Sequence, residues 1–313
     1  MARAAATGSA TTTAASSEAG TADGSSSDGG EASTTGEPAG CLADAMGQGQ
    51  HDGLVIEHDG AMRRYNLYIP EGLDGTVAAP LVLNFHGLTS NAAQQQLFSQ
   101  FDPVADANGL VVAYPEGTDA SWNAGTCCGS AVTNQVDDVG FARAVIADVK
   151  ARTCIDAKRV YATGMSNGGF MSHRLACEAA DAVAAIAPVA GVIGIPLEDC
   201  APSRPVPVLH FHGTLDPLVP YDGNMLWPGA VQTVAQWSML DGCPGDPVET
   251  FDEAEVHCEA SDMCDGGART ELCTVEGGGH CWPGTALCPL GVSTTVLSAS
   301  ERMAEFFAGF SLP

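Results

Sequence analysis

Short unbroken runs of apolar residues alternate along the chain with stretches in which apolar residues recur every three or four positions. The runs are typical of strands buried on both faces, and the recurring positions are typical of amphipathic helices. Strands are expected at residues 64–69, 81–85, 110–114, 160–163, 183–187, 206–211, 248–256 and 270–275. Helices are expected at residues 92–107, 137–152, 169–179, 230–240 and 298–310. This alternation predicts an α/β fold with a mostly parallel sheet that helices cover on both faces.

The first 40 residues differ in composition from the rest of the chain. Of these residues, 32 are Ala, Ser, Thr or Gly, and no large apolar side chain follows Met1. Such a segment cannot bury enough apolar surface to offset the entropy of ordering, and it lacks the apolar core of a signal peptide. We therefore predict a disordered tether over residues 1–40 and one globular domain over residues 41–313.

The chain is strongly acidic. Its 12 Lys and Arg residues stand against 38 Asp and Glu residues, which gives a formal net charge of −26. A field of this sign repels phosphate groups, so neither nucleic acid nor an anionic membrane surface is an expected partner. No apolar run reaches the ~18 residues of a membrane-spanning helix, so no such segment is expected. We expect a monomer.

The chain contains 12 cysteines, which are many for an enzyme-sized protein. Their spacing shows no paired C-x-x-C zinc pattern, so disulfides formed in an oxidising compartment are the better interpretation. This predicts a secreted protein, which the N-terminal segment could tether to a bacterial cell surface. The pairs expected from neighbouring elements are Cys177–Cys200, Cys243–Cys264 and Cys41–Cys154, with Cys127 and Cys128 bridging each other or two separate partners.

The strongest chemical signal is the sequence Gly164-Met-Ser166-Asn-Gly168, which lies between an expected strand and an expected helix. Gly-x-Ser-x-Gly in this setting is the pattern of a nucleophile elbow, a turn so tight that only glycine fits beside the serine. The helix that follows points its free N–H groups at developing negative charge. We therefore predict that Ser166 is a catalytic nucleophile. A glycine-rich packing turn is the alternative.

A serine nucleophile needs a base, and the base needs an acid that orients it. His280 lies in the glycine-rich loop Gly277-Gly-Gly-His280, which follows the last expected strand and can bring an imidazole close to the serine. The acid should follow a strand between the serine and this histidine. Asp216 does so, and Asp222 is the second candidate.

An oxyanion hole needs two main-chain N–H donors. One is expected from Asn167, the residue after the nucleophile. The other is expected from the loop after the strand that ends at Phe85. Because Gly87 lets the next amide turn inward, we choose the N–H of Leu88.

Two more histidines, His210 and His212, alternate on one expected strand, so both point to the same face. A metal pair is conceivable, but no third ligand is evident. We predict no metal and no cofactor.

These motifs together resemble the extracellular esterase family that includes poly(3-hydroxybutyrate) depolymerases and feruloyl and acetylxylan esterases. The matching stretches, between about residue 50 and the C-terminus, are residues 84–88, 136–141, 159–169, 210–216 and 277–284. The resemblance implies an α/β-hydrolase fold with Ser166, Asp216 and His280 as the catalytic triad.

The resemblance also implies aromatic walls around the acyl group. Trp282 and Trp122 are the candidates, with core packing as the alternative, and His86 is a further expected substrate contact. Many members have another residue type at Cys281, so this cysteine suggests a local disulfide with Cys288. Many secreted polyester depolymerases also carry an extra substrate-binding domain, and its absence from this sequence disfavours a crystalline polymer as substrate.

The expected reaction is ester hydrolysis through an acyl-enzyme by a secreted serine esterase. Residues 189–205 form a short connection, so we expect no large lid and an open site that suits esters carried on polymers. Feruloyl or acetyl esters of plant polysaccharide are the favoured substrates, and poly(3-hydroxybutyrate) or a related polyester is the alternative. A peptidase or acyltransferase, or a non-catalytic binding module on the same fold, are the remaining alternatives.

Overall fold

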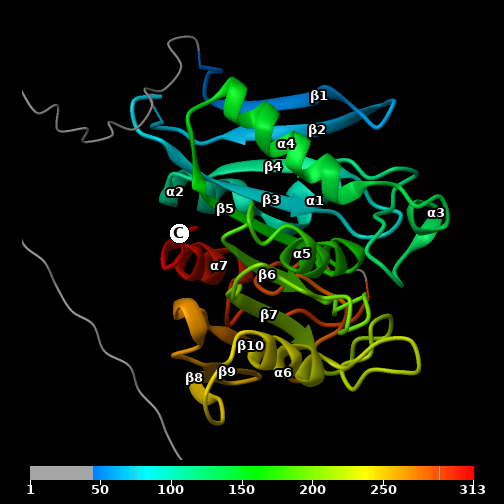
Figure 1. Ribbon diagram of the computed structural model, residues 1–313. Coiled ribbons are helices and arrows are strands. Elements are labelled where there is room, and N and C mark those ends of the chain that lie inside the picture. The colour runs from blue at the N-terminus through cyan, green and yellow to red at the C-terminus, as the bar shows by residue number, and fades with distance from the viewer. Residues whose placement is uncertain (1–44, 74, 289) are drawn as a thin grey trace, which may run out of the picture. The chain divides into compact units, whose positions relative to one another are not determined.

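A sheet of 10 strands forms the centre of the molecule, which the computed structural model describes over residues 45–73, 75–288 and 290–313 (Figure 1). The spatial order of its strands is β1-β2-β4-β3-β5-β6-β7-β10-β9-β8. In chain order they are β1 (Gly49–His58), β2 (Ala61–Ile69), β3 (Ala79–Phe85), β4 (Val111–Pro115), β5 (Ile155–Met165), β6 (Ala185–Val189), β7 (Val208–Gly213), β8 (Val248–Glu253), β9 (Val256–Ser261) and β10 (Thr270–Val275). The expected tether over residues 1–40 lies outside the described residues.

The central strands are parallel, and the two edges of the sheet are antiparallel. Strand β3 pairs in parallel with β4 and β5, and the parallel pairing continues through β6, β7 and β10. Strands β1 and β2 extend one edge in antiparallel fashion, and β9 and β8 extend the other. Because parallel strands end at the same edge of a sheet, the loops after β3, β5, β7 and β10 are brought together there.

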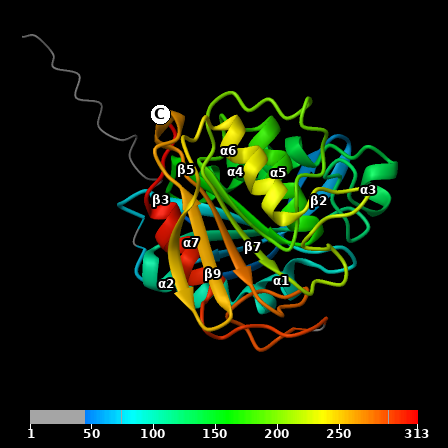
Figure 2. The same ribbon diagram turned by 90° about the horizontal axis from the view of Figure 1, so that it is seen from below.

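Helices cover both faces of this sheet. They are α1 (Ala92–Ser99), α2 (Phe101–Asn108), α3 (Gly129–Thr133), α4 (Asp138–Arg152), α5 (Asn167–Glu178), α6 (Ala230–Leu240) and α7 (Ala299–Ala308). Figures 1 and 2 show α4, α5 and α6 on one face and α1, α2 and α7 on the other. This arrangement confirms the predicted α/β fold class.

The side chains of β3 alternate between the two faces of the sheet, so this one strand contributes to two hydrophobic cores. Leu81, Leu83 and Phe85 point to the face where α4 and α5 pack, whereas Val82 points to the face of α2 and α7. All seven residues of β3 are buried. A strand buried on both faces has no polar alternation, which is why it reads as a continuous apolar run in the sequence.

Two expected elements prove to be divided, and one strand was not expected. The helix expected at residues 92–107 is two helices, because Gln100 adopts a left-handed conformation with φ 47° and ψ 39°. A continuous helix would press the ring of Pro103 against the carbonyl of Ser99, four residues earlier.

The strand expected at residues 248–256 is the hairpin of β8 and β9, with Ala254 at positive φ in its turn. The half-exposed edge strand β1 was missed.

Five disulfides lie within the described residues. Four are pairs that the sequence suggested: Cys127–Cys128, Cys177–Cys200, Cys243–Cys264 and Cys281–Cys288. The fifth, Cys258–Cys273, joins β9 to β10 and was not expected. Cys41 lies outside the described residues, so its pairing with Cys154 stays a prediction. None of the helices in the described residues has the length and apolar character needed to span a membrane.

A buried carboxyl group connects the end of α6 to the segment that leads into β7. Asp241 is fully buried, and its Oδ1 accepts a hydrogen bond of 2.9 Å from the N–H of Val206. Burial raises the pKa of Asp241 to about 7, and the Val206 hydrogen bond opposes this only in part. The folded protein therefore favours the protonated form of this group.

We expect Asp241 to make stability fall as pH rises. In the unfolded chain the carboxyl ionises near its ordinary pKa of 3.8, whereas in the fold it ionises at about 7. Between these values the unfolded state binds fewer protons, so the free energy of unfolding decreases by about 4 kcal/mol at most. About 3 kcal/mol of this loss falls between pH 5 and pH 8, and Asp241→Asn should remove it, measured as urea unfolding at these two pH values. The exposed Asp246→Asn is the matched control, and an equal pH dependence in both variants would contradict the prediction.

Candidate active site

Ser166 occupies a sharp turn between β5 and α5. Its backbone has φ 57° and ψ −121°, a conformation that non-glycine residues rarely adopt. The turn is held by a hydrogen bond of 2.8 Å from the Ser166 N–H to the carbonyl of Val189. A Cβ placed on Gly164 or Gly168 would lie 2.5 Å or 2.1 Å from the carbonyl oxygen of Phe85, so both glycines of the motif are required by close packing.

The structure brings Asp216 and His280 together from two neighbouring parallel strands. Asp216 follows β7 and His280 follows β10, and Asp216 Oδ2 lies 2.7 Å from His280 Nδ1. The other carboxylate oxygen accepts hydrogen bonds from the N–H groups of Leu218 (2.8 Å) and Val219 (2.9 Å). Asp222, the second candidate acid, is exposed.

These hydrogen bonds keep Asp216 ionised. Burial by itself raises the pKa of such a group, but donation from His280 and from the main chain at Val219 and Leu218 outweighs it, so the pKa of Asp216 lies below its ordinary value. An ionised carboxylate can only accept, so the Nδ1 of His280 carries the proton in this hydrogen bond. The Nε2 of a neutral His280 is then free to accept a proton.

Both predicted oxyanion-hole donors lie near Ser166. Asn167 is the first residue of α5, where main-chain N–H groups have no partner inside the helix. Leu88 follows Gly87, and a Cβ on Gly87 would lie 3.4 Å from the Cβ of Ser166. The N–H of Leu88 makes no hydrogen bond to any described residue. The arrangement leaves two donors that can face a negative oxygen beside the serine.

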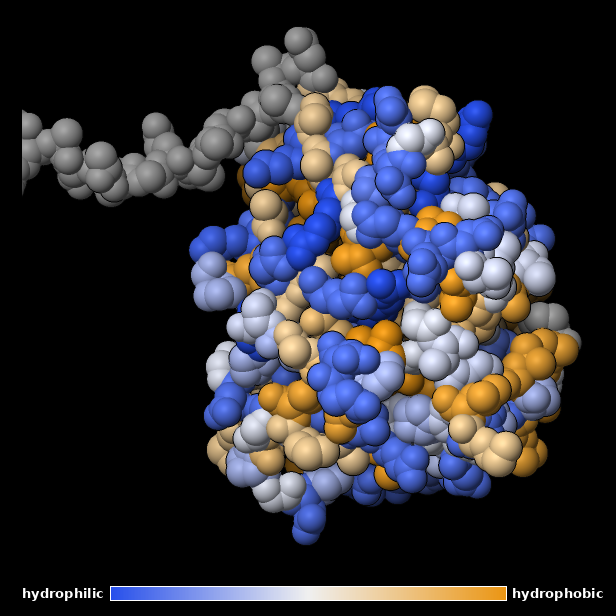
Figure 3. All heavy atoms as spheres, turned by 45° about the vertical axis from the view of Figure 1, so that its right-hand side comes forward, coloured by the Kyte–Doolittle hydropathy of each residue, from blue (hydrophilic) through white to orange (hydrophobic). Residues whose placement is uncertain are grey.

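A cavity of about 470 Å³ opens at this edge of the sheet, and both Ser166 and His280 line it. Its larger side chains are apolar or neutral: Leu88, Phe98, Met165, Leu218, Trp227 and Leu290. The loop before α6 also exposes Leu215, Met225 and Leu226. Figure 3 shows hydrophobic patches among hydrophilic residues on the side of the molecule that it presents. Four of these cavity-lining residues were not among the site residues expected from the sequence: Phe98, Leu218, Trp227 and Leu290.

The two tryptophans expected as acyl-group walls are core residues instead. Trp282 is 1% exposed and its indole N–H donates to the Oγ of Ser300 at 3.0 Å, under α7. Trp122 is fully buried and donates to the carbonyl of His86 at 2.8 Å. Neither lines the cavity that contains Ser166. Both tryptophans therefore pack in the core, which was the alternative interpretation of each.

His86 is also enclosed and does not line the cavity. Its Nδ1 lies 2.7 Å from the carbonyl oxygen of Gly87, and its Nε2 accepts from the N–H of Gly117 at 2.9 Å. Burial lowers the pKa of His86 to about 4, so the ring is neutral near pH 7. The side chain therefore holds the loop that carries Leu88, rather than contacting substrate as expected.

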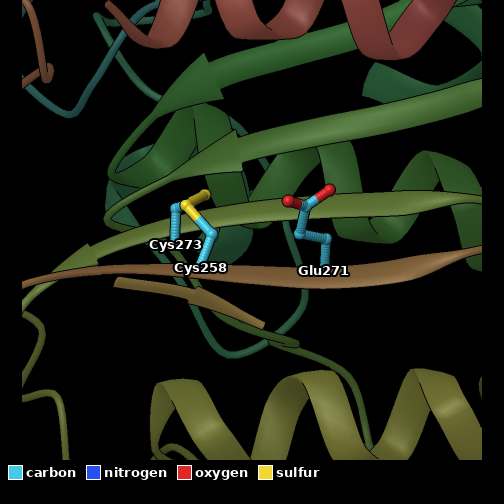
Figure 4. A group of neighbouring side chains, drawn as sticks. All are labelled: Cys258, Glu271 and Cys273. Carbon is cyan, nitrogen blue, oxygen red and sulfur yellow. A yellow bond between two sulfur atoms is a disulfide. The ribbon is translucent and has the colours of Figure 1, made fainter. Parts of the chain in front are cut away.

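Two other groups of side chains among the described residues have metal-ligand chemistry, and protein partners occupy most of their ligand atoms. His210 Nε2 lies 3.0 Å from His212 Nδ1, and His212 Nε2 lies 2.7 Å from the carbonyl of Val219. Cys258, Glu271 and Cys273 also cluster on β9 and β10 (Figure 4). The two sulfurs of that cluster form a disulfide, and Glu271 pairs with Arg269 and Arg302. In the histidine pair only Nδ1 of His210 lacks a hydrogen-bond partner among the described residues, so neither group offers a free set of metal ligands.

Comparison with known proteins relates the chain to proteins that are named as esterases. The family model described as esterase PHB depolymerase matches residues 63–201. Feruloyl esterase B of Piromyces equi is 36% identical over 234 residues, 70% of this chain and 42% of that protein. NocK of Nocardia uniformis subsp. tsuyamanensis, which carries an esterase name, is 30% identical over 281 residues, 80% of each chain. The chain belongs to the esterase PHB depolymerase family.

Solved structures agree with the fold of this esterase family. The acetyl xylan esterase from Aspergillus awamori gives a TM-score of 0.57 at 15% identity and covers 79% of this chain and 94% of that chain. This likeness establishes the α/β-hydrolase fold for the chain. The chain spans about two fifths of the Piromyces equi feruloyl esterase B.

Proposed function

We propose that this chain is a serine carboxylic-ester hydrolase that works through an acyl-enzyme. The observation that carries the proposal is the cavity lined by both Ser166 and His280, with Asp216 bonded to the far side of the His280 ring. This is the constellation of nucleophile, base and orienting acid in acyl transfer. Membership of an esterase family supports the same reaction.

Each residue has a defined part in the proposed reaction. His280 Nε2 takes the proton of the Ser166 hydroxyl as Oγ attacks the ester carbonyl. The N–H groups of Leu88 and Asn167 stabilise the oxyanion of the tetrahedral intermediate. Protonated His280 then gives its proton to the leaving alcohol, and Asp216 stabilises the imidazolium in between. The same steps with water as nucleophile release the acid and restore the serine.

The proposed substrates are hydroxycinnamoyl (feruloyl) or acetyl esters of plant polysaccharide. The relatives named feruloyl esterase and acetylxylan esterase support this class. The absence of charged Asp, Glu, Lys or Arg side chains from the described lining of the cavity suits a neutral acyl group. The five disulfides among the described residues support action outside the cell, where such bonds persist.

A substrate panel tests the proposal. We expect hydrolysis of p-nitrophenyl acetate, methyl ferulate and acetylated xylan, and no cleavage of an aminoacyl anilide. A fluorophosphonate probe should label wild type at Ser166, because the activated serine attacks phosphorus as it attacks an ester. Cleavage of the anilide alone would indicate a peptidase. Cleavage of short poly(3-hydroxybutyrate) chains alone would assign the polyester alternative, and inactivity on every ester with no labelling would overturn the proposal.

A further inference from the structure

The disulfide between the adjacent residues Cys127 and Cys128 lies in the wall of the active-site cavity. Both cysteines line the cavity that also contains Ser166 and His280. Cys127 is 2% exposed and Cys128 is partly exposed, so the disulfide presents surface to the cavity mainly at Cys128. The cavity therefore presents a polarisable, uncharged sulfur surface beside the nucleophile.

This disulfide contributes little to constraining the unfolded chain. A bridge restricts the unfolded state more as the loop that it closes grows longer. The cysteines of the other described disulfides are 7 to 23 positions apart, whereas Cys127 and Cys128 are 1 position apart. We therefore expect this disulfide to act by shaping the folded site rather than by restricting the unfolded chain.

Hydrogen bonds attach the disulfide to the predicted oxyanion hole. The side-chain amide of Asn167 donates to the Sγ of Cys127 at 3.6 Å and to the carbonyl of Trp122 at 3.1 Å. The amide oxygen of Asn167 accepts from the N–H of Trp122 at 2.7 Å. The residue after the nucleophile thus holds the segment that carries both sulfurs.

Trp227 is attached to the same segment and lines the same cavity. Its indole N–H donates to the Oγ1 of Thr126 at 3.1 Å, and its ring packs 5.1 Å from that of Phe170. Thr126 in turn is fixed by hydrogen bonds to the carbonyl of Gly194 from its N–H (2.6 Å) and its hydroxyl (2.9 Å). An indole and a disulfide are thereby held as one surface, which we name the Cys–Trp wall (Cys127, Cys128 and Trp227).

We infer that the Cys–Trp wall binds the aromatic ring of the acyl group and so gives the site its preference for aromatic over acetyl esters. The inference rests on the proposed ester hydrolysis. Sulfur and indole surfaces make favourable contacts with an aromatic ring, and they offer little to a methyl group. The connection through Asn167 places this surface next to the position where the carbonyl oxygen would be bound.

Two substrates with the same leaving group isolate the acyl preference. The ratio of kcat/KM for p-nitrophenyl ferulate to kcat/KM for p-nitrophenyl acetate should fall about tenfold in Cys127→Ala/Cys128→Ala and in Trp227→Leu. The double variant leaves no unpaired thiol. Trp227→Leu keeps the disulfide, so it tests the same surface if the double variant does not fold. Cys243→Ala/Cys264→Ala, which removes a disulfide outside the cavity lining, should leave the ratio unchanged.

The outcomes separate this inference from the proposed function. A wild-type protein that cleaves neither ester would refute the proposed function itself. A wild-type protein that cleaves both, with the same ratio in Trp227→Leu as in wild type, would overturn the inference alone. A loss of equal size on both substrates would also overturn it, because it would assign the wall to the oxyanion hole or to the leaving group.

Discussion

Ser166→Ala should reduce kcat for every ester by roughly 10⁴ to 10⁶ while leaving the fold intact. His280 then has no hydroxyl to deprotonate, and hydrolysis must rely on unassisted water. The substitution removes one oxygen from a turn whose main-chain hydrogen bonds involve Val189 and Phe170 and not the side chain. Substrate should still bind, because the cavity walls are unchanged. Steady-state kinetics with p-nitrophenyl acetate and the melting temperature give the two measurements.

Ser172→Ala provides a matched control on the same helix. The Ser172 hydroxyl donates to the carbonyl of Gly168 at 3.0 Å and does not line the cavity. Its loss should change kcat only severalfold. A folded Ser166→Ala protein with more than about a tenth of wild-type activity would refute the assignment of Ser166 as nucleophile.

The candidate triad could be predicted because each member is positioned by local chain geometry. Gly164 and Gly168 bracket Ser166 in a strand–turn–helix pattern that only a few residue types allow. Asp216 and His280 each follow a strand of the parallel core, and the ends of such strands meet at one edge. Local spacing and topology were therefore sufficient to bring these residues together.

The cavity walls could not be predicted in the same way. Trp227 and Leu218 lie on the long loop between β7 and α6, where no periodicity tells which side chains face inward. Trp282 is two residues after His280, yet it points into the core under α7. Aromatic character and closeness in sequence suggested a substrate contact, but the direction of a loop side chain is decided by tertiary packing.

Asp216→Asn should reduce kcat by about 10⁴ near pH 7. The amide oxygen of the new side chain would accept from the N–H groups of Leu218 and Val219, as Oδ1 of the carboxylate does. The amide nitrogen would then face His280 Nδ1 and donate to it. His280 would be held with its proton on Nε2, so that it could no longer take the proton of Ser166. The positive charge that forms on the ring would also lose its counterion.

Asp222→Asn is the matched control, because Asp222 was the second candidate acid and is exposed on the same loop. It should retain nearly full activity. The comparison needs kcat and the melting temperature for both variants, since Asp216 also caps the turn at Leu218 and Val219. A well-folded Asp216→Asn protein within tenfold of wild type would show that another group orients His280. If Asp222→Asn lost the greater share of activity, the acid would be Asp222, and the hydrogen bond of 2.7 Å between Asp216 and His280 would have only a structural role.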